Sequence, residues 1–170
     1  IPERGGLVSG WSCGGREILY FDQDRYADPS KSIRGGIPVL FPICGNLPGD
    51  VLPVDGVDHP LKQHGFARDL PWQLQLLEDQ SGVCLSLSST DETLKAYPFP
   101  FRLEMELRPV TAALEISTTV HNCGDAAMPF SFGLHPYFNV SDLAQTRLTG
   151  LAERCLNHLE MAEAATVDQL

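Results

Sequence analysis

The sequence lacks three features that would assign it to common functional classes. It has no apolar run of about 18 or more residues, so no segment is expected to span a membrane. No Cys-x-x-Cys pair occurs, which gives no support to a zinc ribbon or a thioredoxin motif. Basic residues are few: 12 Lys and Arg stand against 22 Asp and Glu, and the net charge is -10. Nucleic acid and anionic membrane surfaces are therefore disfavoured as partners, because binding to either needs a basic surface.

The N-terminus has neither an initiator Met nor the basic and apolar pattern of a signal peptide. We therefore expect that the chain begins inside its gene product. The five cysteines are an odd number without a metal-ligand spacing, which favours free thiols and a cytoplasmic location.

Apolar and polar residues alternate in several short segments, and a period of two predicts strands with one buried face. The alternation is clearest at 101–108, where apolar residues occupy one face and charged residues the other. Segments 72–76, 83–88 and 114–120 show the same pattern. Short strands separated by turns predict an all-β fold, an antiparallel β-sandwich, and we expect a single domain over residues 1–170.

Helical signal is weak. A short helix is expected at 91–95, and 156–165 is interpreted as helix or loop. Glu104 and Glu106 share one strand face and could form an acid/base pair, but the alternation favours a solvated face for both.

Three segments break the alternation and are rich in Gly, Pro and His: residues 32–42, 62–72 and 130–139. Arginine suits a phosphate or sugar hydroxyls, and aromatic faces stack on the C–H surface of a sugar. A histidine can donate or accept a proton near neutral pH. Taken one at a time, each segment is also compatible with a surface arginine or a structural histidine.

Together the three segments resemble the mutarotase-like superfamily of aldose 1-epimerases, and specifically its branch that acts on hexose 6-phosphates. The resemblance rests on Arg-Gly-Gly-Ile-Pro at 34–38, His-Gly-Phe-Ala-Arg at 64–68 and Gly-Leu-His-Pro-Tyr-Phe at 133–138. It covers about residues 1 to 150 and implies a galactose mutarotase-like supersandwich.

The resemblance also implies the chemistry. The reaction would interconvert the α and β anomers of an aldose. Its substrate would be a sugar or a sugar phosphate, and it would need no cofactor and no metal. It implies that His135 is the general acid and that the sugar contacts the side chains of His64, Arg34, Arg68, Phe66 and Tyr137.

The family's catalytic base is a Glu on a late strand, well beyond the segment that holds His135. The chain ends about 35 residues after His135, and neither Glu160 nor Glu163 is a suitable base because both come too soon after that segment. We therefore expect the chain to be truncated at its C-terminus and to lack the catalytic Glu.

Two alternatives stay open. The first is a non-catalytic carbohydrate-binding domain of the same fold, which would keep the aromatic and arginine side chains. The second is a metal-binding β-barrel that uses His59, His64 and His135, since imidazoles are common metal ligands. The spacing of five between His59 and His64 puts them on opposite faces of any strand, which disfavours this alternative.

Overall fold

The computed structural model describes residues 1–157, 160 and 162–167. It divides into two compact units, Ile1–Phe138 and Asn139–Leu170, and each is described by itself. The single domain expected over residues 1–170 stays a prediction.

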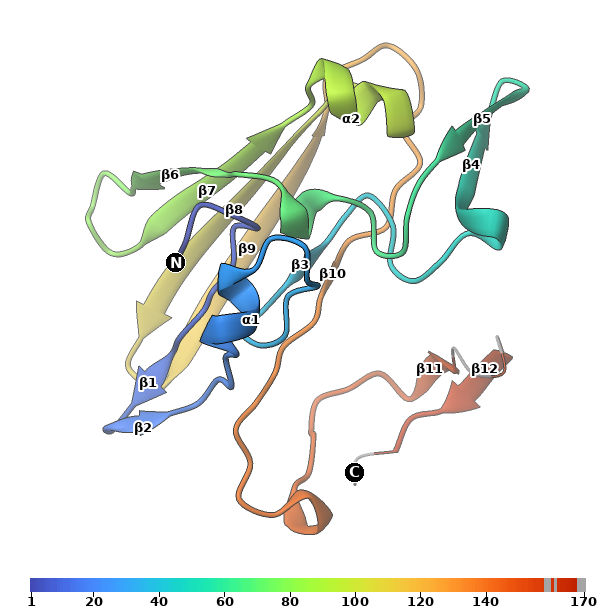
Figure 1. Ribbon diagram of the computed structural model, residues 1–170. Coiled ribbons are helices and arrows are strands. Elements are labelled where there is room, and N and C mark those ends of the chain that lie inside the picture. The colour runs from blue at the N-terminus through green and yellow to red at the C-terminus, as the bar shows by residue number, and fades with distance from the viewer. Residues whose placement is uncertain (158–159, 161, 168–170) are drawn as a thin grey trace. The chain divides into compact units, whose positions relative to one another are not determined.

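The first unit is built on a four-stranded antiparallel sheet in the order β6-β7-β8-β9 (Figure 1). The four predicted strands form it: β6 (Gln73–Leu76), β7 (Val83–Ser88), β8 (Phe101–Val110) and β9 (Ala113–Asn122). The predicted alternation of β8 is confirmed, because Phe101, Leu103, Met105 and Leu107 are all buried.

The opposite face of β8 is polar. Glu104 lies 2.6 Å from an Arg102 guanidinium nitrogen and 2.7 Å from Nε2 of His121, while Glu106 pairs with Arg108. The hydrogen bond with His121 lowers the pKa of Glu104. Glu104 and Glu106 are therefore neutralised on a solvated face, as the alternation predicts.

Short elements complete the first unit. Two-stranded pairings join β1 to β2, β4 to β5 and β10 to β3. The predicted helix is present as α2 and has a capping box at Thr90, whereas α1, which begins after the N-cap Asp22, was not predicted. The bounds of these elements are β1 (Ser12–Cys13), β2 (Arg16–Glu17), α1 (Gln23–Ala27), β3 (Val39–Leu40), β4 (Val51–Val54), β5 (Val57–Pro60), α2 (Asp91–Ala96), β10 (Gly133–Leu134) and the 3-10 turns Pro48–Asp50 and Ala67–Asp69.

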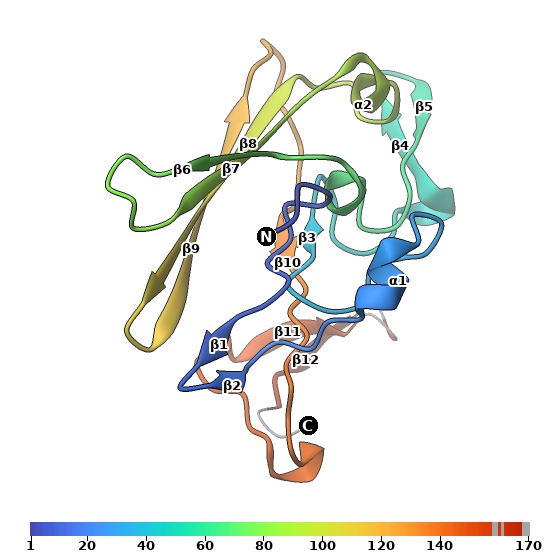
Figure 2. The same cartoon turned by 60° about the vertical axis from the view of Figure 1, so that its left-hand side comes forward.

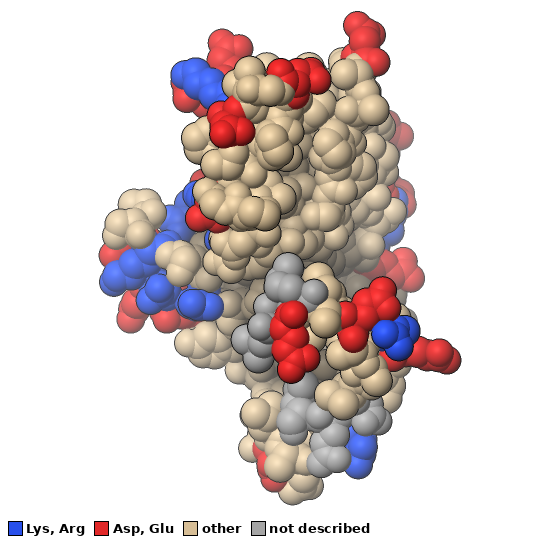
Figure 3. All heavy atoms as spheres, turned by 90° about the vertical axis from the view of Figure 1, so that its right-hand side faces the viewer, with Lys and Arg blue, Asp and Glu red and all other residues tan. Residues whose placement is uncertain are grey.

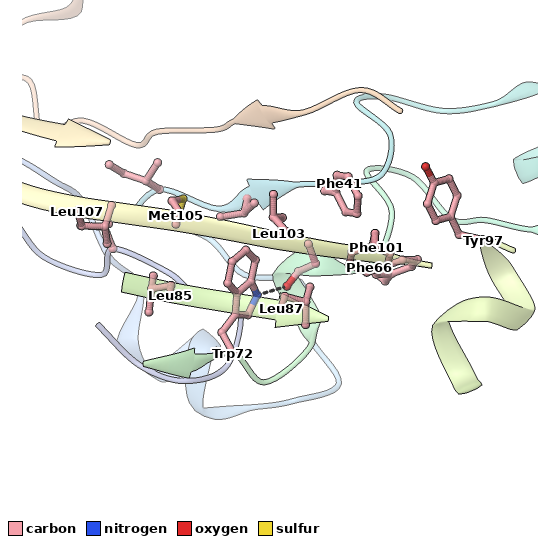
Figure 4. Packing of buried hydrophobic residues seen from close by; sticks show 14 of the residues in the cluster. Phe41, Phe66, Trp72, Leu85, Leu87, Tyr97, Phe101, Leu103, Met105 and Leu107 are labelled. Carbon is pink, nitrogen blue, oxygen red and sulfur yellow. Dashed lines mark hydrogen bonds between the residues drawn. The ribbon is translucent and has the colours of Figure 1, made fainter. Parts of the chain in front are cut away.

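The core lies between the four-stranded sheet and the layer that contains β3 and β10 (Figure 2). Figure 4 shows Phe41, which directly follows β3, packed near Phe101 of β8, and their ring centroids are 4.9 Å apart. Trp72 is buried, and its Nε1–H donates to the carbonyl oxygen of Ala67 over 2.9 Å. Two β layers around one apolar core confirm the predicted all-β sandwich class.

The second unit contains a 3-10 turn (Leu143–Gln145) and an antiparallel pair, β11 (Arg154–Asn157) with β12 (Ala162–Ala165). The prediction of helix or loop at 156–165 is therefore wrong for residues 156–157 and 162–165, which are strand, whereas Glu160 lies in a turn. The physical reason is strand pairing: Arg154 lies opposite Ala165, and its Nε is 3.0 Å from Glu163. Alanine and glutamate favour helix locally, and the cross-strand contacts override that preference.

Among the described residues, no helix has the length and apolar character needed to cross a membrane. In the view of Figure 3, most of the visible Lys and Arg side chains gather at the left, mixed with Asp and Glu.

Candidate active site

The segment that carries His135 extends the ladder between β10 and β3. Gly133 pairs with Leu40 and Leu134 with Val39. The backbone N–H of His135 then donates to Pro38 O over 3.0 Å, and that of Tyr137 donates to Gly36 O over 2.9 Å. Alternate residues of a strand donate in the same direction. Pro136 lies between His135 and Tyr137, where the backbone would point away from this ladder, so its missing N–H removes no bond from it.

This extended backbone brings His135 and Tyr137 together. Residues i and i+2 of a strand share a face, and the two ring centroids are 5.0 Å apart. The Tyr137 hydroxyl in turn lies 3.3 Å from Nη1 of Arg34. His135 and Arg34 are exposed and Tyr137 is half-buried, so an imidazole, a phenol and a guanidinium form one accessible row.

Two glycines let the Arg34 segment pass close to its neighbours. A Cβ on Gly35 would lie 2.6 Å from Tyr20 O, and one on Gly36 would lie 2.5 Å from Val8 O. The Gly35–Gly36 pair therefore allows two backbone segments of the protein to approach each other closely.

His64 lies beside this row, although 71 positions of sequence separate it from His135. The two imidazole centroids are 6.4 Å apart, with the ring planes at 70°. His64 is half-buried and has φ 65°, a left-handed conformation that is uncommon for a residue with a Cβ. Both histidines are thus close enough to contact one small polar ligand.

The His64 backbone is fixed on both sides. Its N–H donates to Gly45 O over 2.8 Å, and the N–H groups of Phe66 and Ala67 both donate to Phe41 O. Gly65 also pairs with Phe41 in a parallel bridge. Gly45 was not predicted as a site residue, because in the sequence it is one more glycine in a loop rich in Gly and Pro.

The remaining expected site residues take different positions. Arg68 is half-buried, and its Nη2 donates to Gln63 O over 3.2 Å, so the guanidinium stays within the His64 segment. In the same segment, Lys62 forms a 2.6 Å ion pair with Asp69, which offsets the charge of the ammonium group. Phe66 is only 9% exposed and belongs to the core, where its ring stacks on Phe101 at 5.9 Å. The ring therefore packs in the core, and a contact between Phe66 and a sugar stays a prediction.

The metal-binding alternative would need His59 beside the other two histidines. His59 lies on β5, where its Nδ1 is 2.8 Å from the carbonyl oxygen of Lys95 in α2. In the part of the chain that the structure describes, no group of three or more His, Cys, Asp or Glu side chains could hold a metal ion.

The chain is similar to a known family and to several curated proteins. The model of the family described as "Aldose 1-epimerase" matches residues 1–169. Curated proteins similar to the chain include one named "Putative glucose-6-phosphate 1-epimerase" from Cenchrus ciliaris, 35% identical over 160 residues. That match covers 86% of the chain and 45% of the relative. A protein of the same name from Escherichia coli is 33% identical, with 92% of the chain and 50% of the relative covered. The chain spans about half the length of the curated relatives it matches.

Solved structures share the fold. The Slr1438 protein from Synechocystis is 45% identical with a TM-score of 0.90, and the match covers 100% of the chain and 60% of that protein. A galactose mutarotase-like protein from Lactobacillus casei is 30% identical with a TM-score of 0.72, over 83% of the chain and 46% of that protein. The family match over residues 1–169 and the 33–35% identity to the curated relatives lead to one conclusion: the chain belongs to the aldose 1-epimerase family.

Proposed function

We propose that the protein carrying this chain interconverts the α and β anomers of an aldose, with a hexose 6-phosphate as substrate. The observation that carries the proposal is the 6.4 Å separation of the His64 and His135 rings, beside the hydroxyl of Tyr137 and the guanidinium of Arg34. Anomerisation needs proton transfer at two oxygens of one small, neutral ring, and this group of donors suits that chemistry.

In the proposed mechanism, His135 protonates the ring oxygen as the bond from C1 to that oxygen breaks, while a base takes the proton of the anomeric hydroxyl. The ring opens to an aldehyde, the C1–C2 bond rotates, and the ring closes on the other face of the carbonyl. The two backbone bonds on either side of Pro136 hold His135 in place. A single positioned acid of this kind contributes about 10²–10⁴-fold to the rate. We assign no base to the described residues.

The side chains around His135 would bind the sugar before the reaction begins. We propose that His64, Tyr137 and Arg34 hydrogen-bond sugar hydroxyls, and that Arg34 and Arg68 favour a phosphate ester. Charge-assisted hydrogen bonds to phosphate are stronger than neutral ones.

The expected free thiols also support a cytoplasmic location, and all five cysteines are free in the structure.

Polarimetry tests the proposal directly. Freshly dissolved α-anomers of glucose and glucose 6-phosphate are mixed with the gene product that carries this chain, and the approach of optical rotation to equilibrium is followed. Acceleration that is lost in His135→Asn supports the enzyme. Sugar binding without acceleration would instead support the non-catalytic carbohydrate-binding domain.

A further inference from the structure

Gly45 and His64 contact each other twice. The His64 N–H donates to Gly45 O over 2.8 Å, and the Gly45 N–H donates to Nδ1 of the His64 imidazole over 2.9 Å. Between the two residues lies the excursion 46–63, which contains the β4–β5 hairpin. The pair of hydrogen bonds therefore closes the base of this hairpin, and we call it the Gly45–His64 clasp.

The second bond of the clasp determines where the imidazole carries its proton. A backbone N–H can only donate, so Nδ1 must present its lone pair. A neutral imidazole has a single N–H, which must then be on Nε2. We infer that the clasp holds His64 as the neutral Nε2–H tautomer, which makes His64 a hydrogen-bond donor to a sugar oxygen and Gly45 a positioning residue. The donor role rests on the proposed function, whereas the tautomer does not.

His59 provides an internal contrast. Its Nδ1 is also 2.8 Å from a backbone group, but that group is the carbonyl oxygen of Lys95. A carbonyl can only accept, so the Nδ1 of His59 must carry a proton. His59 and His64, five positions apart, are thus held with opposite Nδ1 protonation, because one faces a backbone carbonyl and the other a backbone N–H.

The inference separates the roles of the two site histidines. A proton added at Nδ1 of His64 would face the Gly45 N–H, donor against donor, and would break the clasp. His135 is anchored through its backbone N–H to Pro38 O, which leaves its ring nitrogens outside that constraint. His64 therefore suits steady donation to the sugar, and His135 suits the proton transfer itself.

Nitrogen NMR of the imidazoles tests the tautomer without any sugar. In protein labelled at histidine, long-range ¹H–¹⁵N correlations distinguish a protonated ring nitrogen from an unprotonated one, and single His→Asn variants assign the signals. At a pH where both rings are neutral, His64 is expected to show an unprotonated Nδ1 and a protonated Nε2, and His59 the reverse. A protonated Nδ1 on neutral His64 would overturn the inference, whatever the sugar measurements show.

A pair of variants tests the donor role. His64→Asn keeps an acceptor for the Gly45 N–H and tolerates the positive φ, but has no N–H at the Nε2 position. His64→Gln has an amide N–H that can reach that position but no acceptor for Gly45. Calorimetric titration with glucose 6-phosphate is expected to give roughly 2- to 12-fold weaker binding for His64→Asn, the worth of one neutral hydrogen bond. His64→Gln should bind more tightly than His64→Asn.

The outcomes separate the two proposals. Wild-type affinity in folded His64→Asn would overturn the donor role, and this variant decides the matter even where His64→Gln does not fold. A wild-type protein that shows the expected tautomers but no anomerisation would overturn the proposed function alone.

Discussion

Replacing Gly65 by Ala tests whether the close approach of the His64 segment to Phe41 holds the site together. A Cβ at this position would collide with the carbonyl oxygen of Phe41 and lie 2.6 Å from both its carbonyl carbon and Pro42 Cδ. These atoms belong to backbone and to a proline ring, so they cannot rotate away as a flexible side chain would. Gly65 also has φ 69°, which disfavours any residue with a Cβ.

The structure offers a matched control in Gly56, at the turn of the β4–β5 hairpin. Gly56 has φ 80°, but a Cβ there meets nothing within 4 Å. Ala in a left-handed conformation costs about 1–2 kcal/mol, and this cost is common to both variants. Forcing a methyl group into a filled site adds about 1–3 kcal/mol for Gly65 alone. We expect Gly65→Ala to lose roughly 2–5 kcal/mol of unfolding free energy and Gly56→Ala roughly 1–2 kcal/mol.

Urea denaturation of both variants and the wild type measures these losses from the shift of the transition midpoint at constant slope. The N–H groups of Phe66 and Ala67 both bond to Phe41 O, so a collision there should also displace His64. Sugar affinity of folded Gly65→Ala is therefore expected to fall, while that of Gly56→Ala is unchanged. Equal destabilisation of the two variants would refute the reasoning, because the close contact with Phe41 would then carry no cost.

Three further predictions concern catalysis, specificity and pH. His135→Asn should lower kcat by about 10²–10⁴-fold with little change in sugar affinity, since a general acid acts mainly in the transition state; polarimetry beside thermal melts checks this, and wild-type turnover in the folded variant would contradict it. Arg68→Ala should weaken binding of glucose 6-phosphate more than that of glucose, measured by calorimetry; equal affinity of the wild type for both sugars would remove the assigned phosphate role. Burial raises the pKa of Tyr97, whose hydroxyl donates to Pro129 O over 2.8 Å, so its neutral form stabilises the fold. That stability is fully present below pH about 10, where unfolded tyrosine is also neutral, and is lost as the pH rises further. Tyr97→Phe should cost about 0.5–1.5 kcal/mol at pH 7 and flatten the alkaline loss seen in melts; an unchanged alkaline slope would show that Tyr97 is not its source.

The sheet and the family could both be predicted from residue patterns along the chain. A strict alternation such as that of 101–108 allows only one placement of its apolar side chains, so the predicted strand and its buried face were both confirmed. The resemblance carried by the segments at 34–38, 64–68 and 133–138 identified the family that the comparisons show. The pattern was weakest at 156–165, where alanine and glutamate favour helix and the pairing of β11 with β12 decided the outcome.

How the site residues meet depends on pairing between segments that are distant in the chain. Local sequence cannot state that the backbone of Tyr137 pairs with Gly36, and this pairing sets Arg34 beside the Tyr137 hydroxyl. Local sequence also cannot show that Phe66 is buried in the core whereas His64, two positions earlier, is only half-buried. The left-handed backbone at His64 and Gly65 interrupts any regular period. The protonation state of His64 depends on Gly45, which lies 19 positions away and contributes only its backbone. Such contacts depend on backbone hydrogen bonds between distant segments. Nearly every residue type can make these bonds, so the sequence does not show which residues do.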